Sequence, residues 1–218
     1  MKKIAFDDKF NFTDKVIWGD KTQVRVPAQI QVWAYKKNDF EEVPVNKIFR
    51  VPDTNDWAFK TNSQAYALPR QYYPRYNIGE IVAVAESYKR IFDSVQIDKS
   101  YAESKLRICK EYPAFIPEKS FCSKRWVKPE LMPYQIKITD VRIERVQDIS
   151  EEDSLVEGLD IIHIGGSGTK YICKNRGEYV DYTFNPRVAY EFMYKRIYGA
   201  KSWESNPWVW VYEFEIVR

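Results

Sequence analysis

The sequence has few of the residues that hold metal ions or form disulfides. It contains one histidine, His163, and three cysteines, Cys109, Cys122 and Cys173. The cysteines are odd in number and far apart, which argues against a disulfide framework and against the ligand spacing of a zinc site. A single histidine also argues against a histidine-based metal site. We therefore expect no metal ion and no cofactor.

Long apolar runs are missing as well. No run of about 18 apolar residues occurs, and charged residues are spread through the first 20 positions. Neither a membrane span nor a signal peptide is predicted, so a cytoplasmic protein without a membrane partner is expected. A hydrophobic content of 44% in 218 residues is enough for a core. The chain is therefore predicted to form one domain, with or without insertions.

The net charge of +3 is too small to indicate nucleic-acid binding by itself. The charge is unevenly distributed, because positions 99–128 hold eight basic and three acidic residues. This segment includes Lys124 and Arg125, which are candidates for binding a polyanion. The alternative is the solvated surface of an insertion, since charge clusters of this kind are common.

A strand followed by a capped helix is predicted between positions 136 and 159. Apolar residues alternate along the strand but change phase at Thr139–Asp140, which indicates either a bulge or two short strands. Ser150 has the character of a helix N-cap, and Gly158 of the residue just after a helix end. Glu157 then lies in the last turn, where a carboxylate is unfavourable because it opposes the helix dipole. A residue that breaks a local rule in this way is a candidate functional residue.

Capping signals predict two more helices. One opens at Ser100, ends before Pro113 and is expected to bury Ala102, Leu106 and Cys109. The other begins at Asn185–Pro186, ends at Gly199 and carries a tyrosine stripe formed by Tyr190, Tyr194 and Tyr198. Such a stripe is more typical of a core boundary than of a base-stacking platform.

The glycine-rich segment 165–170, GGSGTK, has some features of a phosphate-binding loop. That loop requires G-x-x-x-x-G-K-[ST] between a strand and a helix, whereas here Lys170 is followed by Tyr171 and a predicted strand. We therefore predict a hairpin with a glycine loop. The closing segment, 208–217, alternates large aromatic residues with valine and glutamate and is predicted to be a strand of a barrel wall, with its aromatic face inward or under a helix.

The segment 19–25, GDKTQVR, concentrates chemically different side chains. Within five positions it carries an ammonium, a hydroxyl, an amide and a guanidinium, from Lys21, Thr22, Gln23 and Arg25. If Val24 and Val26 point inward, Gln23 and Arg25 face the other way. A binding loop and an ordinary charged turn leading into a strand both agree with this pattern.

Five motifs, taken in order, resemble those of the ASCH domain proteins of phages and prophages, which belong to the PUA-like superfamily. The motifs are GDKTQVR, IGEIVAVAES (78–87), WVKPELMP (126–133), ITDVRIERVQDISEEDSLVEGL (138–159) and NPWVWVYEFE (206–215). The resemblance implies one α+β domain, with a PUA-like β-barrel of five or six strands and two or three packed helices. Long insertions are then expected near 36–75, 88–130 and 160–185.

The resemblance also implies a cleft beside the barrel that binds RNA or a modified nucleobase. One enzymatic branch of the family removes the acyl group of N4-acetylcytidine with a lysine, a threonine and a glutamate. In this sequence the lysine falls on Lys21 and the glutamate on Glu157, but the threonine falls on Val24, which has no nucleophilic oxygen. Catalysis would then require the hydroxyl of Thr22 or a water molecule activated by Lys21 and Glu157.

Three hypotheses about function remain open from the sequence. The first is a nucleic-acid, nucleobase or nucleotide-binding protein of phage or prophage type, acting in the bacterial or phage-infected cell. Lys21, Gln23 and Arg25 would hold phosphate or a base edge, and Glu86 and Glu157 would recognise amino groups. The second is an amidohydrolase acting on an N4-acylated cytidine-like substrate. The third is a structural or morphogenetic protein with a vestigial cleft.

Overall fold

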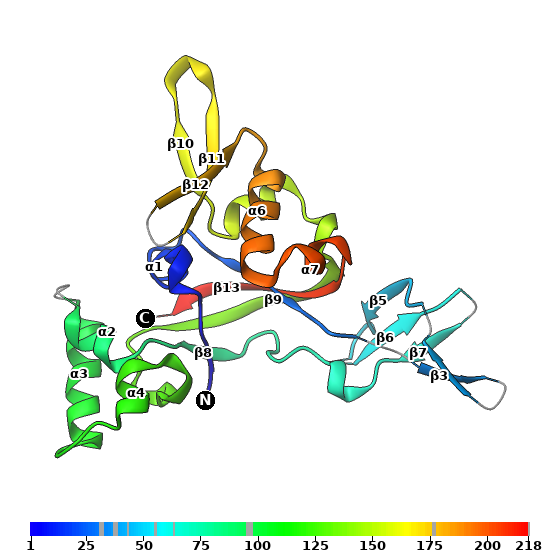
Figure 1. Ribbon diagram of the computed structural model, residues 1–218. Helices are drawn as coiled ribbons and strands as arrows, with labels where there is room; N and C mark the ends of the chain where they lie inside the picture. Colours follow the sequence, from blue (N-terminus) through cyan, green and yellow to red (C-terminus); the bar gives the residue numbers. More distant parts are fainter. Residues whose placement is uncertain are drawn as a thin grey trace.

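The computed structural model describes residues 1–30, 33–36, 39–42, 44–54, 56–62, 64–94, 98–175 and 178–217. It is an α+β structure built on one five-stranded sheet (Figure 1), which confirms the predicted class. The strands, in spatial order, are β1 (Lys2–Ile4), β8 (Ile81–Val84), β9 (Gln135–Arg145), β13 (Trp208–Val217) and β2 (Gln23–Pro27). β1 runs parallel to β8, and the other neighbours are antiparallel.

The two long strands β9 and β13 form the middle of this sheet. Val209 and Val211 on one face of β13, and Trp210 and Tyr212 on the other, are all buried. The register between the strands shifts so that Asp140 opposes Glu213 while Ile138 opposes Phe214, which leaves Thr139 as the extra residue. The phase change in the sequence is therefore a bulge within one continuous strand.

Four helices accompany the sheet: α1 (Phe12–Trp18), α5 (Glu151–Val156), α6 (Pro186–Tyr198) and α7 (Ala200–Glu204). The N-caps predicted for α5 and α6 are confirmed. The hydroxyl of Ser150 accepts a hydrogen bond from the amide of Asp153 at 3.0 Å, and Asn185 Oδ1 accepts one from the amide of Arg187 at 2.9 Å. In Figure 1, α1, α6 and α7 lie on the same side of the central sheet.

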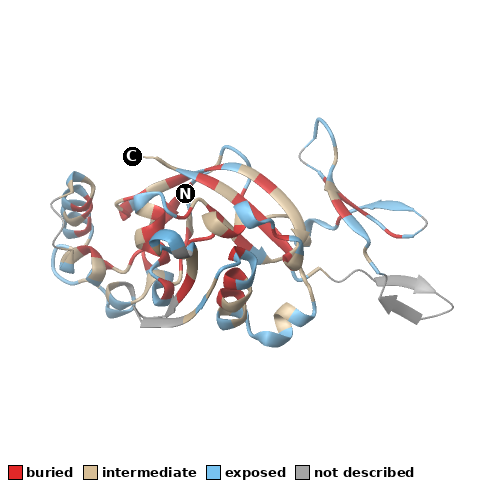
Figure 2. Cartoon of the chain, turned by 90° about the horizontal axis from the view of Figure 1, so that it is seen from above, coloured by how far each residue is buried: buried red, intermediate tan, exposed pale blue. Residues whose placement is uncertain are grey.

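Three smaller units project from this centre (Figure 1), and many of their described residues are exposed (Figure 2). The first contains β3 (Trp33–Lys36), β4 (Asp39–Glu42), β5 (Lys47–Arg50), β6 (Trp57–Lys60) and β7 (Ala65–Ala67). The second contains α2 (Tyr88–Asp93), α3 (Lys99–Glu111) and α4 (Glu118–Cys122). The third is a sheet of β10 (Asp160–His163), β11 (Thr169–Asn175) and β12 (Glu178–Thr183). They fall near 36–75, 88–130 and 160–185, and their description as insertions stays a prediction. β10 and β11 form the predicted glycine-loop hairpin.

Short 3-10 turns connect several of these elements. They are η1 (Asp8–Phe10), η2 (Arg70–Tyr72), η3 (Lys124–Trp126), η4 (Pro129–Leu131), η5 (Val146–Asp148) and η6 (Gly165–Ser167). No described helix combines the length and the apolar character that a bilayer crossing requires.

The sheet does not close on itself within the described part of the chain. β1 and β2 are its two edges and pair with β8 and β13, respectively, but not with each other. The α+β class is thus established, and the predicted barrel stays a prediction.

The predicted buried face of α3 is wrong. Leu106 is 64% exposed and Cys109 is exposed, whereas Tyr101, Ser104 and Ile108 are buried. The hydroxyls of Tyr101 and Ser104 donate to Glu86 Oε2 and to the carbonyl oxygen of Leu131. Polar groups can be buried when they are hydrogen-bonded, so the apolar pattern alone selected the wrong face.

Candidate functional site

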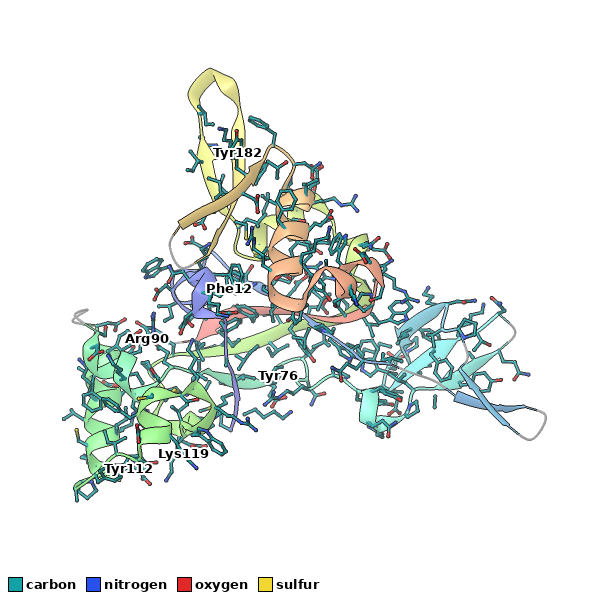
Figure 3. All side chains as sticks on the ribbon, viewed as in Figure 1. Phe12, Tyr76, Arg90, Tyr112, Lys119 and Tyr182 are labelled. Atoms are coloured by element: carbon teal, nitrogen blue, oxygen red, sulfur yellow. The ribbon has the colours of Figure 1, made fainter. Side chains whose placement is uncertain are left out.

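A cavity of about 220 Å³ lies between the start of α1, β2, the end of α5 and one face of α6. Its polar lining includes the charged side chains of Lys21, Arg25 and Glu157. Its aromatic lining comes from Phe12, Tyr190, Tyr194 and Tyr198. Figure 3 labels Phe12 at the start of α1, on the side of the sheet where α6 lies. The cavity therefore has charged groups of both signs and flat aromatic rings in its wall.

Lys21 and Glu157 lie side by side, as the sequence predicted, although 136 positions separate them. Lys21 Nζ is 2.8 Å from Glu157 Oε2 and also donates to the carbonyl oxygen of Glu157. Both side chains are almost fully buried, at 1% and 4% exposure. Burial lowers the pKa of Lys21, and the carboxylate of Glu157 opposes this shift.

Gly158 and Phe12 shape the space around Lys21. Gly158 has φ +93°, the left-handed conformation expected just after a helix end, and a Cβ atom here would lie 3.2 Å from Lys21 Cδ. A side chain at this position would therefore both strain the turn and crowd the lysine. On another side, Lys21 Nζ lies 4.5 Å from the centroid of the Phe12 ring, within cation–π range.

Arg25 is the second buried cation of the cavity, with no exposed side-chain surface. Its guanidinium donates to Glu157 Oε1 at 2.8 Å, to Glu144 Oε1 at 2.7 Å and to Asp153 Oδ2 at 2.7 Å. Burial alone would lower the pKa of Arg25, but the carboxylate of Glu157 and then other neighbours, including Glu144, raise it overall. Glu157 thus bridges two cations, one on each carboxylate oxygen.

β2 does not have the orientation that inward-pointing Val24 and Val26 would give. Gln23 and Arg25 are buried, and Val26 is 38% exposed. The reason is a polar network under the strand, in which Gln23 Oε1 accepts from Arg25 and its Nε2 donates to Glu213 Oε1 at 3.2 Å. Asp153 belongs to the same network through Arg25. A pattern rule that points valines inward fails where remote carboxylates stabilise a buried guanidinium.

Tyr190, like Tyr194 and Tyr198, contributes a hydroxyl-bearing side chain to the lining, and the sequence did not predict it as a site group. Tyr190 is 2% exposed. The hydroxyl of Tyr194 pairs with Ser202 Oγ at 3.2 Å, and that of Tyr198 donates to the carbonyl oxygen of Arg25 at 3.3 Å. Burial, and then the charge of Glu157, raise the pKa of Tyr190, so its hydroxyl keeps its proton. The only sequence signal was its place in the tyrosine stripe.

The two positions considered for a nucleophilic hydroxyl, 22 and 24, differ in whether they line the cavity. Val24 lines the cavity, so a hydroxyl at position 24 would reach it, whereas Thr22 is not among the lining residues. The backbone amide of Thr22 donates to the carbonyl oxygen of Val156, and its carbonyl oxygen accepts from the amide of Phe214. The structure therefore gives Thr22 a backbone role between α5 and β13.

Glu86 does not line this cavity. It lies at the end of β8, is fully buried, and accepts hydrogen bonds on Oε2 from Arg90 Nε at 2.7 Å and the Tyr101 hydroxyl at 2.9 Å. Its Oε1 has no partner among the residues described. Burial raises the pKa of Glu86, and Arg90 opposes the shift. Its partner is thus an arginine four positions later, and a shared role with Glu157 in recognising amino groups has no support in this geometry.

Lys124 and Arg125 have different surroundings. Lys124 Nζ donates to the carbonyl oxygen of Phe6 at 3.0 Å and to Thr13 Oγ1 at 2.8 Å. These hydrogen bonds connect η3 to α1 and to the segment that precedes it. Arg125 is exposed on η3. Lys21 does not extend the positive surface of this segment, because it is buried and paired with Glu157.

The described residues contain no group of three or more histidine, cysteine, aspartate or glutamate side chains arranged to hold a metal ion. Comparison of the chain with family models, with curated proteins and with solved structures finds no match. The functional argument therefore depends on the geometry of the cavity and on the motifs in the sequence.

Proposed function

We propose that the cavity binds a nucleobase, free or as part of a nucleotide, and that the chain is an ASCH-type domain of the PUA-like superfamily. The observation that carries this proposal is the lining itself, in which the paired charges of Lys21, Arg25 and Glu157 lie beside the ring and hydroxyl of Tyr190. A hydroxyl that lines a cavity can donate a hydrogen bond to a ligand there or accept one from it, and such a bond adds to the affinity.

The chemistry of the lining suits a planar heterocycle. Proteins that accept an extruded base hold it between aromatic or apolar side chains and hydrogen-bond its polar edge. Here Phe12 and the tyrosines of α6 supply rings, and the Tyr190 hydroxyl supplies a donor next to the carboxylate of Glu157. The volume, about 220 Å³, is below the roughly 300–1,000 Å³ of pockets for drug-sized ligands. A single base is favoured over a larger ligand.

An amidohydrolase acting on an N4-acylated cytidine is the second candidate, favoured by one observation. Lys21 and Glu157, the lysine and glutamate implied by the resemblance, are paired in the cavity whose wall includes Val24. The missing element is the nucleophile, because valine has no oxygen and the Thr22 position is outside the lining. Binding is therefore the better supported function, with hydrolysis dependent on an activated water.

Two tyrosine-to-phenylalanine variants test the binding proposal. Calorimetric titration with cytidine, N4-acetylcytidine, uridine and adenosine identifies the preferred base for the native protein. Tyr190→Phe should then weaken that affinity by about 2- to 12-fold, the worth of one hydrogen bond. Tyr194→Phe is the matched control, because it removes a hydroxyl from the same wall that is already paired with Ser202.

The expected result is a loss of affinity in Tyr190→Phe only, with Tyr194→Phe affecting stability and not binding. Equal affinities of native protein and Tyr190→Phe for every nucleoside that binds would contradict the role of the hydroxyl. Absence of binding by any of the four nucleosides at millimolar concentration would remove the base-binding proposal itself.

A further inference from the structure

A surface outside the cavity gathers cations from three distant parts of the chain. Lys2 and Lys3 come from β1, Arg75 from the segment before β8, and Lys119 and Arg125 from α4 and η3. We call this set of five residues, together with the indole of Trp126, the cationic track. In Figure 3, Tyr76, which follows Arg75, and Lys119 are labelled on opposite sides of the N-terminal strand.

Hydrogen bonds to backbone oxygens hold the parts of the track together. Lys2 Nζ donates to the carbonyl oxygen of Arg75, and Lys3 Nζ donates to those of Arg125 and Val127, the first of these at 2.8 Å. Partial burial lowers the pKa of Lys3, and the charge of Arg75 lowers it further, so the two cations lie close enough to repel each other. The track is therefore a feature of the fold and not of one sequence segment.

Cations exceed carboxylates along the track. Glu80 pairs with Lys2, and Glu130 pairs with the amino group of Met1. No described carboxylate forms an ion pair with Lys3, Arg75, Lys119 or Arg125. Four positive charges thus remain to attract an anion. This local excess of positive charge is larger than the net charge of the whole chain, which is +3.

An exposed aromatic ring lies at one end of the track. Trp126 is 53% exposed, and its ring lies 5.2 Å from Arg125 Cζ and 5.9 Å from Lys119 Nζ, measured from the ring centroid. A large exposed ring between two cations offers a stacking face for a base beside groups that attract phosphate. Phosphate and base bind together in this way on single strands, whose bases are unpaired and accessible.

We propose that the cationic track binds the backbone of single-stranded nucleic acid, with one base stacked on Trp126. This deepens the proposed function, because the base in the cavity would then belong to a strand held on the track. The two regions adjoin. Phe6 and Asp7 line the cavity three and four positions after Lys3, and three residues span at most about 11 Å. Lys124, the neighbour of Arg125, donates to the carbonyl oxygen of Phe6.

The hairpin sheet of β10, β11 and β12 is a weaker candidate for this role. Tyr182 and Phe184 are each 60% exposed there, with Lys170 Nζ 3.9 Å from the centroid of the Tyr182 ring. Its described carboxylates are paired, Asp160 with Lys15 and Asp181 with Arg196. Among the side chains described on this sheet, Lys170 supplies the cation, and affinity for a strand grows with the number of phosphates neutralised.

Fluorescence anisotropy with a labelled 12-nucleotide single-stranded RNA tests the proposal. If four phosphates are neutralised, the slope of log K against log salt should be about −2.8, a loss of roughly 50-fold between 50 and 200 mM salt. Arg75→Glu/Arg125→Glu should remove most of the binding and flatten the slope. Trp126→Ala should weaken binding roughly tenfold or more with little change in slope, because stacking is uncharged.

Each change has a matched control elsewhere on the surface. Lys47→Glu/Lys201→Glu reverses two exposed charges outside the track, and Trp18→Ala removes a tryptophan that is 58% exposed on α1. Both controls should bind RNA within about twofold of the native protein. All four variants should keep the native melting temperature within a few degrees.

The proposal would be overturned if the native protein failed to bind this RNA at 50 mM salt. It would also fail if the control charge reversal weakened binding as much as the track reversal, or if Tyr182→Ala/Phe184→Ala abolished binding while Trp126→Ala did not. Nucleoside titration separates this result from the cavity proposal. Arg75→Glu/Arg125→Glu should leave nucleoside affinity unchanged, whereas Tyr190→Phe should weaken it.

Discussion

The protein buries two glutamates in opposite kinds of surroundings. Glu157 has a cation on each carboxylate oxygen, Lys21 on one and Arg25 on the other. Glu86 shares one arginine with Asp14, accepts a hydrogen bond from Tyr101 on the same oxygen, and leaves its Oε1 without a described partner. Both carboxyl groups are almost completely removed from solvent.

The difference shows why a buried charge cannot be assessed by burial alone. Both positions are desolvated, but Glu157 has two cations beside it, whereas Glu86 has one, which it shares with Asp14. At Glu86, burial raises the pKa, and the hydrogen bond and charge of Arg90 oppose the shift. The Glu157 region is therefore a network whose members depend on one another, whereas the Glu86 region depends on a single arginine.

The same substitution at both positions should separate the two regions most clearly. Glu157→Leu leaves Lys21 buried without its carboxylate and deprives Arg25 of one, so we expect it to lower the free energy of unfolding by about 3–5 kcal/mol. Glu86→Leu should cost about 1–3 kcal/mol, because Arg90 keeps Asp14 and is 31% exposed. Urea denaturation at pH 7 measures both.

Lys21→Met/Glu157→Leu is the control for this comparison. It removes both buried charges of the pair, so much of the stability lost in Glu157→Leu should return. Equal losses in the two single leucine variants would show that the second cation at Glu157 makes no difference.

Glu86 should also make the free energy of unfolding depend on pH. This effect should be smaller than the losses in the leucine variants, and its sign follows from the raised pKa. Its folded-state pKa is raised above the ordinary 4.5, so Glu86 contributes stability below that pH and loses it as pH rises through the raised value. The stability of the native protein relative to Glu86→Gln should therefore fall as pH increases from 4 and then level off. At neutral pH the free energies of unfolding of the native protein and of Glu86→Gln should differ by about 1 kcal/mol.

Urea denaturation of both proteins across that pH range provides the measurement. A difference that rises with pH would mean that the carboxylate is stabilised in the folded state, as at an ordinary ion pair. Glu86 would then belong to the same class as Glu157.

The smallest expected change in stability is that of Val24→Thr, about 1 kcal/mol, because the new hydroxyl faces the cavity. Its effect on chemistry is the informative part. The native protein should release little or no acetate from N4-acetylcytidine, and the variant should release more if Lys21 and Glu157 support an acyl intermediate. Acetate release followed by chromatography compares the two proteins.

Two outcomes would change this conclusion. A folded Val24→Thr protein without activity would remove the amidohydrolase alternative. Native turnover that survives Thr22→Val but not Lys21→Ala would instead show that the cavity activates water directly, and that the binding proposal understates the function.

Much of the local structure could be predicted because its causes lie within a few residues. The cap at Ser150, the left-handed Gly158, the bulge at Thr139 and the helix opened by Asn185 each depend on hydrogen bonds or dihedral angles of neighbours in sequence. The proximity of Lys21 and Glu157 was predicted from the motif resemblance and from the unfavourable place of a glutamate at a helix end.

The tertiary structure alone decided which side chains are buried and what compensates them. Arg25 faces inward because Glu144, Asp153 and Glu157, all more than 100 positions away, surround it. Tyr194 has Ser202 beside its hydroxyl, whereas Tyr190 lies near the charges of Glu157 and Arg25. Charge burial and hydrogen-bond partners are sums over distant segments, so the periodicity of one segment determines its element but not its chemistry.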